Sequence, residues 1–143
     1  MKEVNVIYWS STGNTQAMAE AVGAGVEEAG GKANVIEVSA ADVSMLKDAD
    51  SFALGASAMG DEELDAEMDD FVTAVEEICS GKTVGLFGSY DWGDGEWMRK
   101  WVDRMTAAGA TVVNGEGLIC QETPDDAMIE ECKNLGKALA ANA

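Results

Sequence analysis

Five short runs of apolar and β-branched residues are spaced along the chain. Runs of this length and composition predict buried β-strands. They lie at residues 4–9, 33–38, 51–56, 83–88 and 111–119. Gly115 and Gly117 weaken the prediction for the last run, because glycine often interrupts a strand.

Between these runs, apolar residues recur at helical spacing. One such series predicts a helix over residues 14–29, which Gly30 ends. Further helices are predicted to carry residues 68–79, 97–105 and 128–139, with a short helical turn near 42–46. Strands that alternate with helices pair in parallel through right-handed crossovers. The pattern therefore predicts one α/β domain over residues 1–143, with a doubly wound parallel sheet and helices on both faces.

The net charge limits the kinds of molecule that the protein is expected to bind. The chain has 143 residues, with 9 Lys and Arg against 27 Asp and Glu, for a net charge of −18. Nucleic acids and anionic membrane surfaces bind clustered positive charge, so neither is expected to be a partner. Proteins with basic docking surfaces are expected instead. The chain has no histidine, which excludes histidine-based triads, general bases and metal ligands.

The cysteines and the start of the chain indicate a compartment. Cys79, Cys120 and Cys132 are far apart, and no Cys-x-x-Cys occurs, so neither a metal site nor a dithiol redox centre is predicted. The start lacks the features of a signal peptide, and no apolar run approaches the roughly 20 residues of a membrane span. We expect a soluble, cytoplasmic protein with free thiols.

The loop after the first predicted strand is the first candidate site. It places four hydroxyls, an amide and a glycine at the start of a predicted helix. Free backbone N–H groups and the helix dipole favour an anion there. A helix cap needs only one such residue, so the loop predicts a phosphate cradle, although it matches neither a P-loop nor Gly-x-Gly-x-x-Gly. Its residues are Ser10, Ser11, Thr12, Gly13, Asn14 and Thr15.

Two further loops follow the third and fourth predicted strands. One contains Ser57, Ala58, Met59, Gly60, Asp61 and Glu62, and the other contains Ser89, Tyr90, Asp91, Trp92 and Gly93. Alone, the first would indicate only a surface turn before an acidic helix. The second carries large aromatic side chains among glycines, which suits stacking on a flat ring. In α/β folds, ligands bind at the carboxyl ends of the strands. The three loops together predict a planar heterocycle that carries a monophosphate.

These loops resemble the FMN-binding loops of the short-chain flavodoxins, most of all the clostridial type. The likeness is carried by Tyr-Trp-Ser-Ser-Thr-Gly-Asn-Thr (8–15), Ala-Met-Gly-Asp-Glu (58–62) and Phe-Gly-Ser-Tyr-Asp-Trp-Gly-Asp-Gly (87–95). It spans essentially the whole chain, in order and at matching spacing. It implies a five-stranded sheet of order 2-1-3-4-5, non-covalently bound FMN, and a monomeric, low-potential one-electron carrier without substrate turnover of its own.

The resemblance also implies a role for each loop. Residues 10–15 and Ser57 would hold the phosphate, and Ser89 would lie near the ribityl chain. Trp92 would stack on one face of the ring and Met59 would pack against the other. Glu62 would accept the N3 hydrogen, and the N–H groups of Asp91 and Gly93 would point toward N1 and O2. The Gly60 carbonyl, in the flexible Gly60-Asp61 peptide, would turn toward a protonated N5, so a stable neutral semiquinone is expected.

Two positions depart from the family pattern. Ser11 and Asp91 stand where glycine is usual, and Asp91 adds a carboxylate near the N1 edge of the ring. A cluster of carboxylates beside the second loop is expected to dock basic rims on redox partners. It consists of Asp61, Glu62, Glu63, Asp65, Glu67, Asp69 and Asp70.

Other functions stay open at this point. An FMN-dependent reductase would need a substrate pocket over the ring, for which Trp92 and Met59 leave little room. A flavodoxin-like activator of ribonucleotide reductase is a second alternative. A phosphoacceptor receiver domain is excluded, because Ala56 and Ser57 stand where the phosphorylated aspartate would be.

Overall fold

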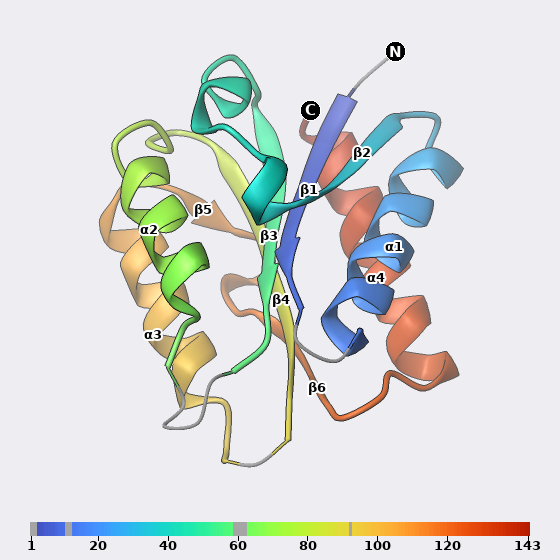
Figure 1. Ribbon diagram of the computed structural model, residues 1–143. Coiled ribbons are helices and arrows are strands. Elements are labelled where there is room, and N and C mark those ends of the chain that lie inside the picture. The colour runs from blue at the N-terminus through green and yellow to red at the C-terminus, as the bar shows by residue number, and fades with distance from the viewer. Residues whose placement is uncertain (1–2, 11–12, 59–62, 92) are drawn as a thin grey trace.

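A twisted parallel sheet forms the middle layer of the molecule (Figure 1). The computed structural model describes residues 3–10, 13–58, 63–91 and 93–143. The strands run in the order β2-β1-β3-β4-β5, and β6 also pairs with β4. Their bounds are β1 Glu3–Trp9, β2 Lys32–Glu37, β3 Ser51–Ala56, β4 Thr83–Tyr90, β5 Thr111–Val112 and β6 Leu118–Gln121. The predicted order and parallel pairing are confirmed.

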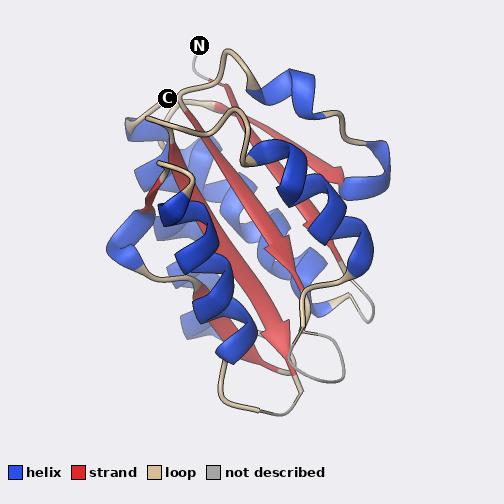
Figure 2. Cartoon of the chain, turned by 90° about the vertical axis from the view of Figure 1, so that its left-hand side faces the viewer, coloured by secondary structure: helices blue, strands red, loops and turns tan. Residues whose placement is uncertain are grey.

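Two pairs of helices cover the two faces of the sheet (Figures 1 and 2). α1 (Asn14–Glu28) and α4 (Asp126–Ala141) cover one face, and α2 (Ala66–Val75) and α3 (Glu96–Ala107) cover the other. Each face has its own apolar core. Ile7, Phe52 and Leu54 point toward α2 and α3, while Val6 and Ala53 point toward α1 and α4. Successive residues of a strand face opposite sides of the sheet. A continuous apolar run therefore indicates a strand that is buried on both faces.

The prediction of one continuous strand over residues 111–119 is wrong. β5 ends at Val112, a 3₁₀ turn η3 (Val113–Gly115) leaves the sheet, and the chain returns to β4 as β6. Asn114 and Gly115 have φ angles of 63° and 72°, in the left-handed region that extended strands do not use. β5 and β6 together therefore fill the position of one edge strand beside β4.

Two other predicted boundaries are corrected. β4 continues through Ser89 and Tyr90, which were expected in a loop, because residues 87–90 pair with β6. α2 ends at Val75, so Cys79 lies beyond a turn rather than in the helix. The short turn predicted at 42–46 is the 3₁₀ helix η2 (Val43–Leu46), and a further one, η1 (Val38–Ala40), directly follows β2.

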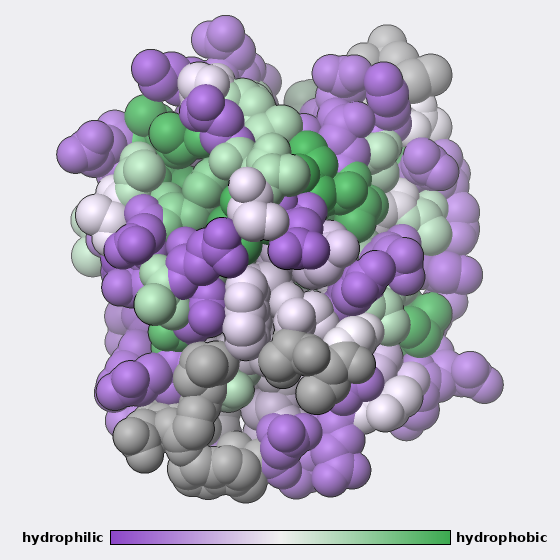
Figure 3. Space-filling view, in the orientation of Figure 1, coloured by the Kyte–Doolittle hydropathy of each residue, from purple (hydrophilic) through white to green (hydrophobic). Residues whose placement is uncertain are grey.

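Apolar and hydrophilic residues separate on the face drawn in Figure 3. Apolar residues gather in a band across the upper middle of this face, and hydrophilic residues lie above it and along both sides. Among the described residues, no helix is long and apolar enough to cross a bilayer. The three cysteines are free and buried, as predicted.

Candidate functional site

Four connections leave the sheet at one edge, the lower edge in Figure 1. Because β1, β3, β4 and β6 are parallel, their carboxyl ends meet there. We call this place the carboxyl edge, and its described residues are 10, 13–15, 57–58, 89–91, 93 and 121–123. The predicted site residues among them are thus brought together by the topology.

The start of α1 is open to an anion. Gly13 is the N-cap residue, with a φ of 95°, and no side chain among the described residues caps the helix. Its own N–H donates to the Ser10 hydroxyl at 3.0 Å, so Ser10 holds the turn closed. A Cβ at Gly13 would meet nothing within 4 Å. No described side chain accepts from the first-turn N–H groups, and such unpaired groups are the donors that an anion binds at a helix start.

A buried chain of hydroxyls lies behind this helix start. The Thr15 Oγ1 and Ser57 Oγ atoms are 2.7 Å apart, and the Ser89 N–H donates to Thr15 Oγ1 at 3.2 Å. The three residues are 0%, 7% and 3% exposed. Ser and Thr hydroxyls are polar groups that burial penalises unless they are paired. These hydrogen bonds connect α1 to the ends of β3 and β4.

At the end of β4, some residues pack against the core and others lie at the surface. The Tyr90 ring packs against Trp97 of α3, with ring centroids 5.5 Å apart, so Tyr90 belongs partly to the core. The Ser89 carbonyl accepts from the Ala58 N–H at 3.1 Å, which joins the second and third loops. Asp91 and Gly93 are exposed.

Several predicted contacts fall outside the described residues. They are those of Ser11, Thr12, Met59, Gly60, Asp61, Glu62 and Trp92. The ring stacking and the N3 and N5 contacts expected of these residues stay predictions.

A fourth segment at the carboxyl edge was not predicted. Gln121 ends β6 and Glu122 and Thr123 follow it, and all three hydrogen bond to the first or third loop or to β4. Two of the four bonds use the backbone of Glu122, which leaves no pattern of residue types in the sequence, and the other two use the side chains of Gln121 and Thr123. The available signal was topological, since this segment also follows the carboxyl end of a strand.

Not all of the carboxylates in the predicted docking cluster are exposed, and docking itself stays a prediction. The Asp65 carboxylate caps α2, accepting from the N–H groups of Glu67 at 2.9 Å and Met68 at 3.1 Å. Asp69 pairs with Arg104 of α3. Of the described acidic residues there, Glu63, Glu67 and Asp70 remain exposed.

Positive charge near the carboxyl edge is compensated. Arg99 pairs with Asp94 at 3.0 Å, which lowers the pKa of that carboxyl, and Lys100 pairs with Glu96 at 3.4 Å. None of residues 10–15 or 57–62 is Lys or Arg. The cradle therefore offers neutral donors only, and these fit the phosphate of FMN through hydrogen bonds rather than through a counter-ion.

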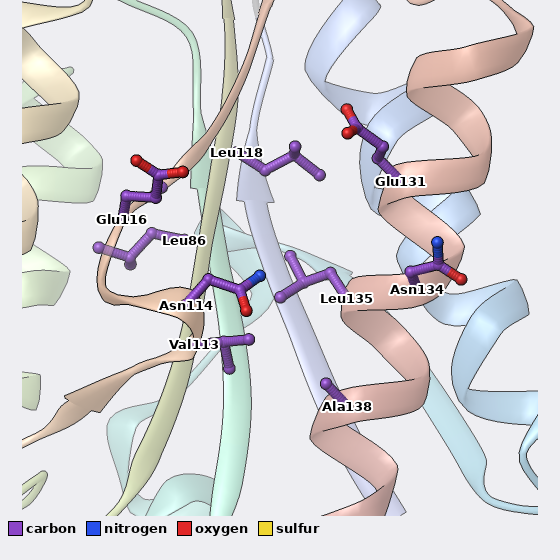
Figure 4. Close-up of a pocket in the computed structure, with 10 residues that line it drawn as sticks. Leu86, Val113, Asn114, Glu116, Leu118, Glu131, Asn134, Leu135 and Ala138 are labelled. Atoms are coloured by element: carbon purple, nitrogen blue, oxygen red, sulfur yellow. The ribbon is translucent and has the colours of Figure 1, made fainter.

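The described residues also line cavities away from this edge, and two of them share residues. One of about 370 Å³ opens between the η3–β6 connection and α4, with Leu118 and Leu135 in its wall and Glu116 and Glu131 at its sides (Figure 4). A second, of about 640 Å³, lies against α3 and also reaches Glu116 and Glu131. None of the described site residues lines either. Among the described residues, no cluster of Cys, Asp or Glu could hold a metal ion.

Comparison with known proteins identifies the family. Residues 6–136 match the family described as Flavodoxin. A flavodoxin of Clostridium beijerinckii is 44% identical over 96% of this chain and 99% of its own length, and one of Megasphaera elsdenii is 44% identical over 96% and 98%. The solution structure of two-electron reduced Megasphaera elsdenii flavodoxin superposes with a TM-score of 0.86 at 43% identity, covering 96% of this chain and 98% of that one. Fold, loops and sequence thus agree with the short-chain type, and the chain belongs to the flavodoxin family.

Proposed function

We propose that this flavodoxin carries single electrons at low potential between redox enzymes. Membership of the family makes it an FMN-binding electron carrier. The observation that supports FMN binding at this place is the start of α1, which no described side chain caps, together with the buried Thr15 and Ser57 hydroxyls. Bound FMN supplies the redox-active ring. The chain's own residues bind it, orient it and set the charge around it.

The phosphate is assigned to the first loop and Ser57. Asn14 and Thr15 present N–H groups of the first helical turn, and Gly13 leaves room for the anion. Ser57 lies 2.7 Å from Thr15, so the two hydroxyls converge on the same place. Ser10, Ser11 and Thr12 complete the cradle in this proposal.

The ring is assigned to the second and third loops. Met59 and Trp92 would cover its two faces, and Gly60, Asp61 and Glu62 would border N5 and N3. Asp91 and Gly93 would direct N–H groups to the N1 side. Ala58, Ser89 and Tyr90 would support these loops, as the bond from the Ala58 N–H to the Ser89 carbonyl indicates.

The low potential is supported by charge. The chain carries a net charge of −18, and the cradle adds no cation. Added negative charge on a bound ring is then opposed by the surrounding field, which lowers the reduction potential. Glu63, Glu67 and Asp70 are exposed beside the second loop, and we assign them to brief, salt-sensitive contacts with basic surfaces of redox partners.

The proposal also covers the number of domains, the oligomeric state, substrate turnover and the cellular compartment. A single domain over 1–143 is supported by relatives that match nearly end to end. We propose a monomer without substrate turnover of its own, in the cytoplasm, where three buried free cysteines would stay reduced.

Titration of the apoprotein with FMN and riboflavin tests the cradle. FMN should bind far more tightly, and Thr12→Ala should weaken FMN alone by about 1–3 kcal/mol, the value of a hydrogen bond to a charged group. Equal affinity for the two flavins would refute the phosphate cradle. Steady-state oxidation of NAD(P)H by the purified holoprotein would instead support an FMN-dependent reductase.

A further inference from the structure

The segment Gln121–Thr123 touches both ends of the FMN site. Figure 1 shows the connection from β6 to α4 passing close to the start of α1. Within three residues it reaches the third loop through Gln121, β4 through Glu122 and the first loop through Thr123. The segment Ser57–Ala58 also reaches the first loop, through Thr15, and β4, through Ser89, but Gln121–Thr123 is bonded to Asp91 as well.

Glu122 joins the segment to β4 by its backbone. Its N–H donates to the Tyr90 carbonyl at 2.8 Å, and its carbonyl accepts from the Ser89 hydroxyl at 2.7 Å. The residue has a φ of 59°, a left-handed conformation that costs a non-glycine residue free energy. The two bonds on opposite sides of the residue hold this conformation.

Thr123 sets the direction of the Asn14 side chain. The Thr123 hydroxyl donates to Asn14 Oδ1 at 3.3 Å. An amide group that accepts with its oxygen presents its two N–H donors on the other side. Asn14 is the first residue of α1, so those donors are available where an anion binds.

Gln121 makes the corresponding contact at the ring end. Its Nε2 donates to the Asp91 carbonyl at 3.3 Å. That bond holds the Asp91 carbonyl, in the third loop.

We propose that Gln121, Glu122 and Thr123 form a strap that holds the phosphate end and the ring end of the FMN site in register. All three are positioning residues. Thr123 turns the Asn14 amide so that its N–H donors face the phosphate, and Gln121 steadies the loop at the ring. The inference rests on the proposed function, because it assigns the two ends to two parts of FMN.

The test compares flavins that share one end. Apoprotein variants are titrated with FMN and with riboflavin, which has the ring and ribityl chain but no phosphate. Thr123→Val keeps the shape of the side chain without the hydroxyl, and should weaken FMN binding about 3- to 10-fold, as for one hydrogen bond, while riboflavin binding stays unchanged. Thr123→Ser, which retains the donor, should restore the wild-type ratio. Gln121→Met should weaken both flavins alike.

A matched pair tests the backbone of the strap. Glu122→Gly and Glu122→Val remove the same charge, but only valine is β-branched and strained at a φ of 59°. Valine should therefore weaken FMN about tenfold relative to glycine. Equal affinities for this pair, or a Thr123→Val effect that is absent or the same for both flavins, would overturn the strap. A wild-type apoprotein that binds no FMN would overturn the proposed function instead.

Discussion

Glycine serves opposite purposes in the α1–α4 contact and at the carboxyl edge. Gly25 of α1 lies directly against the backbone of Lys133, and Gly136 of α4 lies against the backbone of Val22. A side chain at either would force the two helices apart. Gly13 has open space around it and instead needs a φ of 95°. The first region depends on close approach, and the second depends on backbone conformation.

The difference separates stability from binding. The α1–α4 contact is closed, apolar and continuous with a buried core that includes Val22 and Cys132. The carboxyl edge is built from hydroxyls, carbonyls and N–H groups whose donors converge on a place between loops. Substitutions in the first should lower the free energy of unfolding and leave flavin preference alone. Substitutions in the second should change flavin affinity, with a smaller loss of stability where a left-handed φ is required.

The largest effect is expected from Gly25→Ala. The new Cβ would meet the Lys133 backbone, which cannot yield as a side chain does, so we expect a loss of about 3 kcal/mol in the free energy of unfolding. Urea denaturation followed by circular dichroism measures it. The control is Gly23→Ala in the same helix, whose Cβ would meet the Val35 side chain at 2.7 Å. Val35 is exposed enough to move, and the gain in helix propensity should offset the contact. Similar losses in both variants would contradict the close-approach argument.

The ionisation of the Cys132 thiol reports whether water reaches the α1–α4 contact. Burial raises the pKa of its thiol to about 12, with smaller contributions from Cys120 and Glu131. The pKa of the thiol in the unfolded chain is about 9.0, so above that pH the unfolded state binds fewer protons and stability falls. Between pH 9 and 11 this thiol should cost about 2 kcal/mol. The Cys132→Ala variant should lose less stability over that interval. Parallel pH profiles would mean that water reaches the thiol.

Gly13→Ala should have a smaller effect on stability and a specific effect on binding. An L-residue held at a left-handed φ costs about 1–2 kcal/mol. Gly30, at the other end of α1, has a φ of 90° and open space around it, so Gly30→Ala should cost the same in unfolding experiments. Only Gly13→Ala should also shift the FMN affinity, because relaxation of its backbone turns the first N–H groups of α1. Unchanged FMN binding would remove Gly13 from the cradle.

The elements that sequence patterns predicted well are those held by burial. β3 was predicted at its observed bounds, because a central strand buried on both faces shows as one apolar run. β4 was predicted two residues short, since Ser89 and Tyr90 join it only through pairing with β6. That pairing connects residues some 30 positions apart, and no local pattern reports it. The break after Val112 did carry a local signal, the Asn114-Gly115 turn.

The site shows the same division. The hydroxyl-rich first loop could be proposed as a phosphate cradle because an anion at a helix start favours a recognisable set of residue types, and that assignment stays a prediction. The strap was missed because Glu122 acts through its backbone, which any residue carries. Asp65 was misjudged for a related reason: a carboxylate that caps a helix and one that faces a partner have the same sequence signature.

The smallest effect is expected from Asp91→Gly, which restores the residue usual in the family. Asp91 is exposed, and its carbonyl rather than its carboxylate is the group held by Gln121. A carboxylate about 6 Å from charge that develops at N1 opposes it by about 0.7 kcal/mol in a water-like dielectric, which is about 30 mV for one electron. The substitution should raise the second one-electron potential by about that amount at low ionic strength and by less in high salt. The first potential should not move, because no net charge is added to the ring when an electron and a proton arrive together.

Asp91→Asn is the matched control, since it removes the charge but keeps the side chain. If asparagine and glycine raise the second potential equally, charge alone is responsible. A shift with glycine only would trace the effect to the backbone of the third loop, and no shift with either would mean that the carboxylate points away from the ring.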